Sequence, residues 1–173
     1  MPSYVGLLRA VNLGGTNKVP MAELRALLES MGHSDVTTVL QSGNVIFTSR
    51  RPTKAEPLEA AIEAKFGLAI DVLLRSPDEL RQVLSANPFP HADASSLHVG
   101  FMAQAPAPAV LAKLDAGRFR PEEFAIRGAD LYLHLPNGMG KSKLPPYLAR
   151  QLKIPTTIRN WNTVTKLAEL TRR

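Results

Sequence analysis

The stretch with the clearest chemical potential is a polar loop close to the N-terminus. Residues 7–28 read LLRAVNLGGTNKVPMAELRALL. A strand-like run ends at Ala10, glycines and polar residues follow, and Pro20 is expected to open a helix. Glycines let a backbone approach a ligand closely, amide side chains orient it, and a cation at a helix N-terminus attracts anions. The loop therefore predicts a site for a small anionic ligand, such as a phosphorylated molecule.

A second polar segment is expected beside this loop. In a β-α-β-β-α-β unit, the loop after the first strand and the turn between the second and third strands share one end of the sheet. That rule brings residues 11–19 close to the turn at 41–44. The predicted ligand-binding residues, which we call the rim, are Arg9, Asn12, Gly14, Gly15, Asn17, Lys18, Gln41, Ser42 and Asn44. The alternative is a purely structural loop, whose glycines adopt positive φ and whose asparagines close turns.

Another candidate anion site lies at GMGKS, residues 138–142, which resembles the end of a phosphate-binding loop. The full pattern requires glycine at position 135, where Leu135 stands, so that motif is incomplete. Lys141 and Ser142 still lead into a predicted helix, whose start can hold an anion, and both are candidate ligand-binding residues. Ser142 can equally be an ordinary N-cap.

Metal and catalytic signatures are weak. The chain has no cysteine, which excludes disulfides, thiolate metal sites and cysteine nucleophiles. His98 and His134 are expected on neighbouring strands, as a pair within the sheet rather than a metal site. No Ser-His-Asp order or paired-carboxylate pattern marks a catalytic residue. We expect no cofactor and no metal, and the sequence leaves open whether the protein is an enzyme.

Composition and charge limit the class of protein. With 173 residues, of which 45% are hydrophobic, the chain can bury a core without covalent staples. Its net charge of +6 attracts phosphates, so weak nucleic-acid binding is an alternative to a small anionic ligand, and improved solubility is another. No signal peptide or membrane span is predicted. We expect a cytoplasmic protein without membrane contact, and the sequence does not specify its oligomeric state.

Hydrophobic periodicity predicts the elements that must position these residues. The first half is expected to contain strands at 4–10, 36–41, 45–48 and 70–75, and helices at 20–31 and 55–66. The second half is expected to contain strands at 97–102, 123–127, 130–135 and 156–159, and helices at 108–114 and 143–152. Further helices are predicted at 77–86 and 161–170, and Asn160 is well placed to cap the last one.

The repeated order predicts an α+β fold of two ferredoxin-like (β-α-β-β-α-β) halves, a degenerate duplication with an added C-terminal helix. Val5-Gly6 in the first strand is echoed by Val99-Gly100, and Gly43 in the first hairpin by Gly128. A single continuous α+β sheet is the alternative.

The predicted domains are the first half at 1–76 and the second half, with the C-terminal helix, at 97–173. A helix and a proline-rich linker at 77–96 separate them. Several strands are apolar on both faces, which predicts covered sheets rather than an exposed platform on which bases could stack.

Five motifs, in this order, resemble one widespread bacterial family. They are LLRAVNLGGTNKVPMAELRALL at 7–28, QSGNVIF at 41–47, NPF at 87–89, GMGKSKL at 138–144 and RNWNTVTKL at 159–167. Over almost its whole length the chain is similar to the family called domain of unknown function 1697. This resemblance implies an α+β fold of ferredoxin-like halves. It implies no activity, so no catalytic residue can be transferred.

Overall fold

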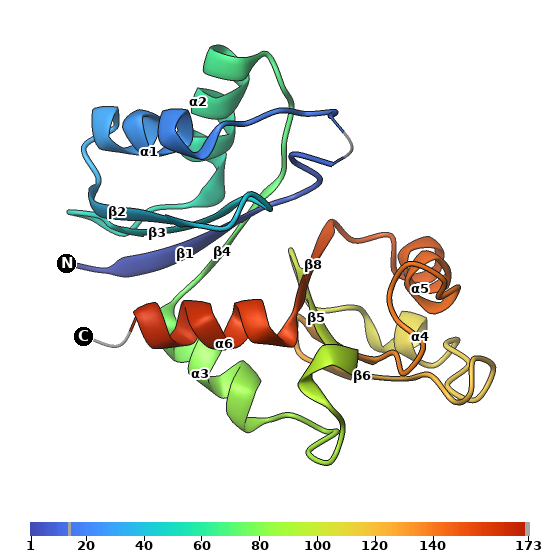
Figure 1. The fold of residues 1–173 in the computed structure, drawn as a ribbon. Coiled ribbons are helices and arrows are strands. Elements are labelled where there is room, and N and C mark those ends of the chain that lie inside the picture. The colour runs from blue at the N-terminus through green and yellow to red at the C-terminus, as the bar shows by residue number, and fades with distance from the viewer. Residues whose placement is uncertain (14, 172–173) are drawn as a thin grey trace. The chain divides into compact units, whose positions relative to one another are not determined.

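A computed structural model describes residues 1–13 and 15–171 (Figure 1). Within these residues the chain forms two four-stranded antiparallel sheets and six α-helices, an α+β fold. The alternative of one continuous sheet is therefore wrong. None of the helices in the described part of the chain is long and apolar enough to cross a membrane.

The chain divides into two compact units. The first comprises Met1–Arg81 together with the residues from Leu167 onward, and the second comprises Gln82–Lys166. The domain boundaries at 1–76, 77–96 and 97–173 stay a prediction.

The sheet of the first unit has the strand order β2-β3-β1-β4. The strands are Ser3–Leu8 (β1), Ser34–Val39 (β2), Asn44–Thr48 (β3) and Val72–Arg75 (β4). Helices Met21–Ser30 (α1) and Ala55–Phe66 (α2) lie on one face of this sheet (Figure 1). The core between the helices and the sheet includes Leu8, Leu24, Leu28, Val45, Phe47, Leu58 and Ile62.

Side chains along β1 alternate between the two faces of the sheet. Leu8 belongs to the helix-side core, whereas Val5 and Leu7 are equally buried on the opposite face. Gly6 lies on the helix side, where an added Cβ would be 3.0 Å from Cγ1 of Val45. Both faces are therefore covered, as the apolar strands predicted.

Parts of two further helices belong to the opposite face of this sheet. They are residues 77–81 of α3 (Pro77–Ser85) and the residues from Leu167 onward in α6 (Trp161–Leu170). Pro77 and Leu170 line a cavity together with Ser3 and Ile46, which share the face of Val5.

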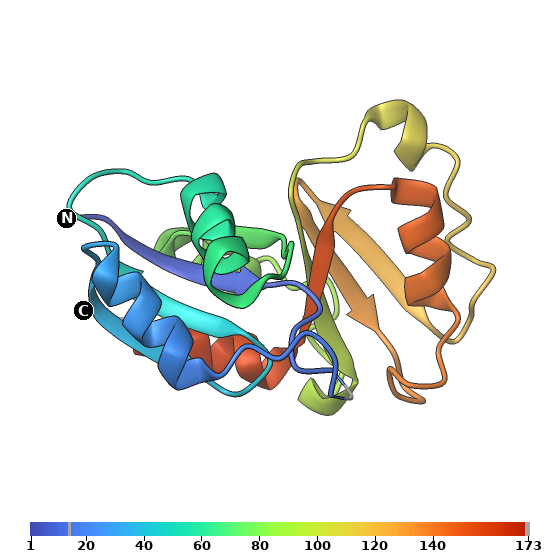
Figure 2. The ribbon, with the colours of Figure 1, turned by 90° about the horizontal axis from the view of Figure 1, so that it is seen from above.

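The sheet of the second unit has the strand order β6-β7-β5-β8. Its elements are Leu97–Met102 (β5), Glu123–Arg127 (β6), Asp130–His134 (β7), Thr156–Asn160 (β8), Pro108–Leu111 (α4) and Leu144–Leu152 (α5), preceded by a 3-10 turn at Ala94–Ser96. Figure 2 shows α4 and α5 on one side of this sheet. The core that they help to form includes Met102, Leu131, Leu133, Leu144, Leu148 and Leu152.

The two sheets share their register as well as their strand order. The equivalent pairs are Val5–Arg75 with Val99–Arg159, and Gly6–Leu74 with Gly100–Ile158. In both units the arginine donates from Nη1 to the carbonyl of the residue before it, at 3.0 Å for Arg75 and 3.1 Å for Arg159. The Val-Gly echo of the sequence therefore marks the same point in each sheet.

The helix that follows each sheet is capped at an equivalent position. Ser76 Oγ accepts the Glu79 N–H at 3.1 Å, and the Glu79 carboxylate accepts the Ser76 N–H at 2.7 Å, which is a capping box. Asn160 Oδ1 accepts the Thr163 N–H at 2.8 Å, which confirms the predicted cap of α6.

Most predicted elements are present, but several ends differ. β1 ends at Leu8 because Ala10 has a φ of +56°, which cannot continue a strand. Pro20 is the extended N-cap of α1 rather than its first helical residue. α4 ends at Leu111. The turn after it is tighter than an α-helix, because the Leu114 N–H donates to the carbonyl of Leu111, three residues earlier.

Removing either cap should destabilise the protein by a similar amount. Ser76→Ala and Asn160→Ala each delete an acceptor for an N–H in the first helical turn, which typically costs about 1 kcal/mol. The exchanges Ser76→Asn and Asn160→Ser retain an acceptor and should stay within about 0.5 kcal/mol of the parent. Chemical denaturation of the four variants measures these differences. An alanine variant as stable as the parent would contradict the assignment.

Candidate functional site

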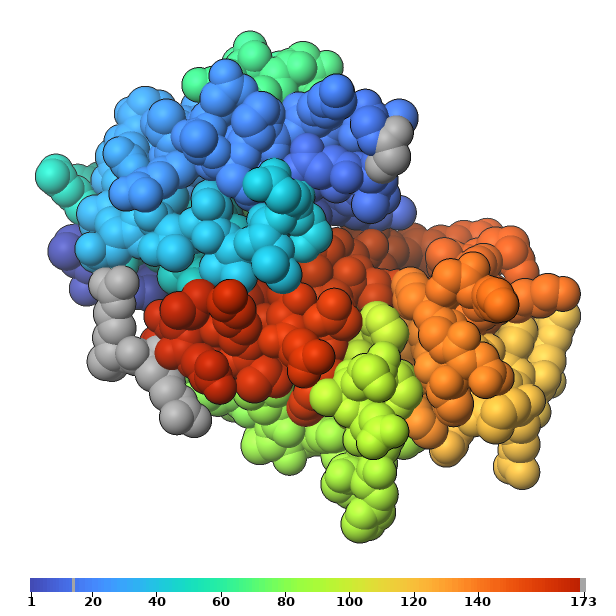
Figure 3. All heavy atoms as spheres, viewed as in Figure 1, coloured from blue at the N-terminus to red at the C-terminus, as the bar shows by residue number. Residues whose placement is uncertain are grey.

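The loop 11–19 and the turn 41–44 lie at the same end of the first sheet, as the topology predicted. Asn12 Nδ2 donates to the carbonyl of Gln41 at 2.6 Å. At the base of the turn, the Leu8 N–H donates to the carbonyl of Gly43 at 2.8 Å. These bonds join two segments about thirty residues apart into one polar edge, the rim, and Figure 3 shows its dark-blue loop at the surface of the first unit.

Asparagines hold the loop closed. Asn12 Nδ2 also donates to the carbonyl of Val19 at 3.0 Å, and Asn12 Oδ1 accepts the Val19 N–H at 2.8 Å. Asn17 Nδ2 donates to the carbonyl of Ala10 at 3.1 Å, and the Asn12 N–H donates to the carbonyl of Asn17 at 3.0 Å. Both amides thus make bonds within the loop, as the structural alternative expects.

The turn is organised in the same way. Asn44 is fully buried, and its Nδ2 donates to the carbonyl of Val39 at 2.8 Å and to Ser42 Oγ at 2.9 Å. Asn44 thus fixes the turn from inside the sheet. Gln41 and Ser42 remain exposed at its surface.

Three further residues of the rim offer groups to solvent. Lys18 is exposed, and Gly15 has a φ of +83° with no atom within 4 Å of an added Cβ. Arg9 Nη1 pairs with Asp71 Oδ2 at 3.1 Å, but both side chains are nearly half exposed, so this ion pair is weak. Gly14 lies outside the described residues.

Strained backbone is concentrated at the rim. Among the described residues six non-glycine residues have positive φ. Two of them, Asn12 and Asn17, belong to the rim, and two more, Ala10 and Leu40, are next to rim residues. Asparagine tolerates this conformation, whereas Leu40, at +60°, does so at an energetic cost. Leu40 and Leu13 are also 54% and 60% exposed. The sequence pattern did not single out these two leucines, because each reads as an ordinary apolar residue.

Gly43 permits the close approach of the loop to the turn. An added Cβ would lie 2.5 Å from Val11 Cγ2 and 2.9 Å from Leu8 Cβ, and φ is +85°. Any other residue at this position would push the two segments of the rim apart.

The second predicted anion site has few donors. Lys141 and Ser142 precede α5 in the second unit, and Ser142 Oγ accepts the Leu144 N–H at 3.1 Å. The next two residues of α5 are prolines without an N–H, and the Tyr147 N–H bonds to the carbonyl of Lys143 at 3.2 Å. The first turn of α5 therefore offers no unengaged N–H, although the N-cap of the helix is Lys143 rather than Ser142.

His98 and His134 lie on neighbouring strands as predicted, but they do not form a pair. His98 is opposite Leu133, and His134 is opposite Leu97, so the two imidazoles point to different faces of the sheet. The predicted pair is wrong because successive residues of a strand point to opposite faces of the sheet. Among the described residues, no cluster of three His, Asp or Glu side chains could hold a metal ion.

Buried arginine is a feature that sequence reasoning missed. Arg159 is only 7% exposed and donates from Nη1 to Thr157 Oγ1 at 2.5 Å. Burial lowers its pKa to about 10. The only signal in the sequence is that Arg159 ends a predicted strand just as Arg75 does, which the proposed duplication would have linked.

The comparisons with known proteins concern family and fold. The description "Protein of unknown function (DUF1697)" belongs to the family model that matches residues 1–132. Among solved structures, the chain is similar to the conserved bacterial protein SP0830 from Streptococcus pneumoniae. That likeness has a TM-score of 0.71 at 24% identity and covers 99% of each chain, which shows a shared fold. No curated protein matches.

Gly43, in the turn, and Gly15, in the loop, should respond differently to substitution by alanine. Gly43→Ala adds both positive-φ strain and contacts that are too close, so it should cost about 2–4 kcal/mol. Gly15→Ala adds strain alone and should cost about 1 kcal/mol. Chemical denaturation of both variants measures the difference. Equal costs would mean that the loop and the turn can separate easily.

Acid should weaken the fold through His98. Burial lowers the pKa of His98 below its usual 6.5, an effect larger than that of its hydrogen bond to the Ser96 backbone. The unfolded chain therefore binds the proton more readily, so this contribution to stability is complete above pH 6.5 and is lost as the pH falls through the lowered pKa.

His98→Gln should accordingly reduce the loss of stability between about pH 7.5 and about pH 5, as followed by denaturation midpoints. His91→Gln, at an exposed position, is the matched control. If His98→Gln and the parent lose stability equally, burial of His98 is not the cause.

Proposed function

Because this chain belongs to DUF1697, a family of proteins of unknown function, we propose its function from the geometry of the rim: the protein binds a small anionic ligand there, such as a phosphorylated molecule. The observation that carries this proposal is the concentration of positive-φ residues at the rim. Strained backbone persists where the surrounding structure enforces it, and such positions cluster at binding sites.

Charge at the rim comes from two side chains. Lys18 is exposed next to the start of α1, and Arg9 is held by an ion pair that a ligand could replace. The first three N–H groups of α1 have no acceptor within the helix, and their dipoles add to the positive potential. Asn12 and Asn17 serve as a scaffold that keeps this loop in shape for the ligand.

Apolar contact would come from Leu13 and Leu40, which are both more than half exposed. A leucine held at positive φ and turned to solvent gains nothing from the fold itself. We therefore expect a ligand that carries an apolar group next to its anionic group.

The alternative of weak nucleic-acid binding rests on the net charge of +6. Stacking of bases on the sheets is not supported, because Phe47, Phe101 and Tyr132 are buried and Tyr4 is half-buried against Phe47, with 5.6 Å between the ring centroids. For the alternative that the protein is an enzyme, we assign no catalytic residue.

We also propose a common fold and a common origin for the two halves of the chain. Each half is a ferredoxin-like unit, and the two arose by duplication. The common strand order, the common register of the Val-Gly pairs and the equivalent arginines and helix caps support it.

Titration of the full chain with phenyl phosphate tests the proposed site. The parent should bind this probe, and Lys18→Ala should weaken binding by about tenfold, which corresponds to the loss of one charge-assisted contact of about 1.5 kcal/mol. Gly15→Val should weaken binding more, because a valine cannot adopt positive φ and the loop would lose several contacts at once.

Gly15→Asn is the matched control, since asparagine tolerates positive φ and should retain most of the affinity. Calorimetry measures binding, and circular dichroism verifies that each variant is folded. If all variants bind phenyl phosphate as the parent does, while Gly15→Val only lowers the melting temperature, the loop is purely structural.

A further inference from the structure

A cavity of 260 Å³ lies on the face of the first sheet opposite α1 and α2. Its polar lining consists of Ser3, Asp35, Thr48, Asp78, Arg81 and Thr171. Ser3 and Thr48 are paired across β1 and β3 at the start of β1, whereas the rim lies beyond the end of that strand. The cavity is therefore a separate feature of the same unit, and its volume approaches the range of small-molecule pockets.

Irregular backbone places Asp35 at this cavity. Asp35 has a φ of +50°, and the register between β2 and β3 shifts between Ser34 and Thr37. A bulge of this kind redirects a side chain at the edge of a sheet, and bulges are frequent next to functional sites. The strained aspartate is thus a second observation that points to this cavity.

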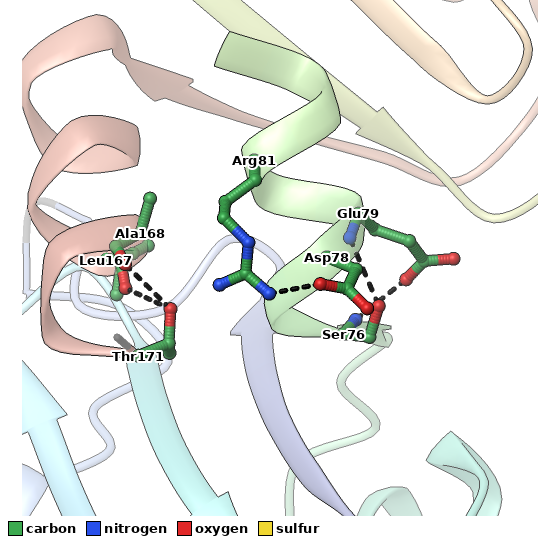
Figure 4. A network of polar contacts seen from close by, with 7 residues as sticks. All are labelled: Ser76, Asp78, Glu79, Arg81, Leu167, Ala168 and Thr171. Atoms are coloured by element: carbon green, nitrogen blue, oxygen red, sulfur yellow. Dashed lines mark hydrogen bonds and ion pairs between the residues drawn. The ribbon is translucent and has the colours of Figure 1, made fainter. Parts of the chain in front are cut away.

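Arg81 supplies the cation. Its Nη2 forms an ion pair with Asp78 Oδ1 one helical turn earlier in α3, as Figure 4 shows. The two side chains are 45% and 82% exposed, so the pair contributes little to stability. A ligand carboxylate could replace Asp78, because a guanidinium binds carboxylates in a bidentate, planar arrangement.

Hydroxyl oxygens complete the polar lining. Thr171 Oγ1 donates to the carbonyls of Leu167 and Ala168 at 3.0 and 2.9 Å, which leaves its oxygen able to accept (Figure 4). Ser3 Oγ and Thr48 Oγ1 are 3.4 Å apart and can likewise accept. Such oxygens, together with a carboxylate, suit an ammonium group.

We propose that this cavity binds a small zwitterion, an α-amino acid with an aliphatic side chain. Its carboxylate pairs with Arg81, its ammonium group pairs with Asp35, and the side chain contacts Ile46 and Leu170, which also line the cavity. Opposite charges within one small cavity favour a molecule that carries both charges over a simple anion or a simple cation.

The first test uses L-leucine and two analogues that each lack one charge. Isocaproate has no ammonium group, and isopentylamine has no carboxylate. In calorimetric titrations of the full chain with excess phenyl phosphate present to occupy the rim, L-leucine should bind and each analogue should bind at least about tenfold more weakly. Failure of L-leucine to bind, or equal binding of either analogue, would overturn the proposal.

Variants assign the two charges. Asp35→Asn removes the charge while keeping a residue that tolerates positive φ, and Arg81→Lys keeps the charge but loses the planar fork. Each should weaken L-leucine binding by about tenfold or more. Arg25→Ala, outside the lining and paired with Glu29 on α1, should leave binding unchanged.

Asp78→Asn has an opposite and diagnostic effect. It removes the carboxylate that competes for Arg81, so L-leucine should bind more tightly, although the first turn of α3 loses a favourable negative charge and the melting temperature should fall slightly. Weaker binding by Asp78→Asn, or unchanged binding by both Asp35→Asn and Arg81→Lys in folded protein, would contradict the assignment.

Discussion

The carboxamide of Asn12 is the interaction on which the rim depends. Through its bonds to the backbone of Val19 and Gln41, it fixes where the loop enters α1 and ties the loop to the turn. Gly43 makes this possible, because only a residue without a side chain leaves room for Val11 and Leu8. Because the Asn12 amide is engaged in these bonds, the proposed ligand is recognised by the charged and apolar side chains that the loop and the turn expose.

The same backbone plan supports both units. Each sheet has a central Val-Gly pair opposite an arginine, and the next residue caps a helix. The loops differ much more than the sheets. A long asparagine-tied loop leads from β1 into α1, whereas the equivalent segment from β5 into α4 consists only of residues 103–107. Variation of loops on a repeated scaffold is how one fold acquires different sites.

Periodicity predicted nearly every element, and topology alone predicted that the loop would meet the turn. What remained depended on contacts between distant residues. Asn44 reads as a surface turn residue, yet it is buried, because its partners lie across the turn. The separation of His98 from His134 depends on strand register, and the cavity at Asp35 depends on a bulge. Neither feature has a signature in local sequence.

The central claim is that the rim is a binding surface for an anionic ligand. Chemical-shift mapping of backbone amides during a titration with phenyl phosphate tests it most directly. The largest shifts should cluster at Gly15, Thr16, Lys18 and the turn around Leu40, and the sheet of the second unit should be unaffected. Shifts absent from the rim, or spread evenly over basic residues throughout the chain, would contradict it.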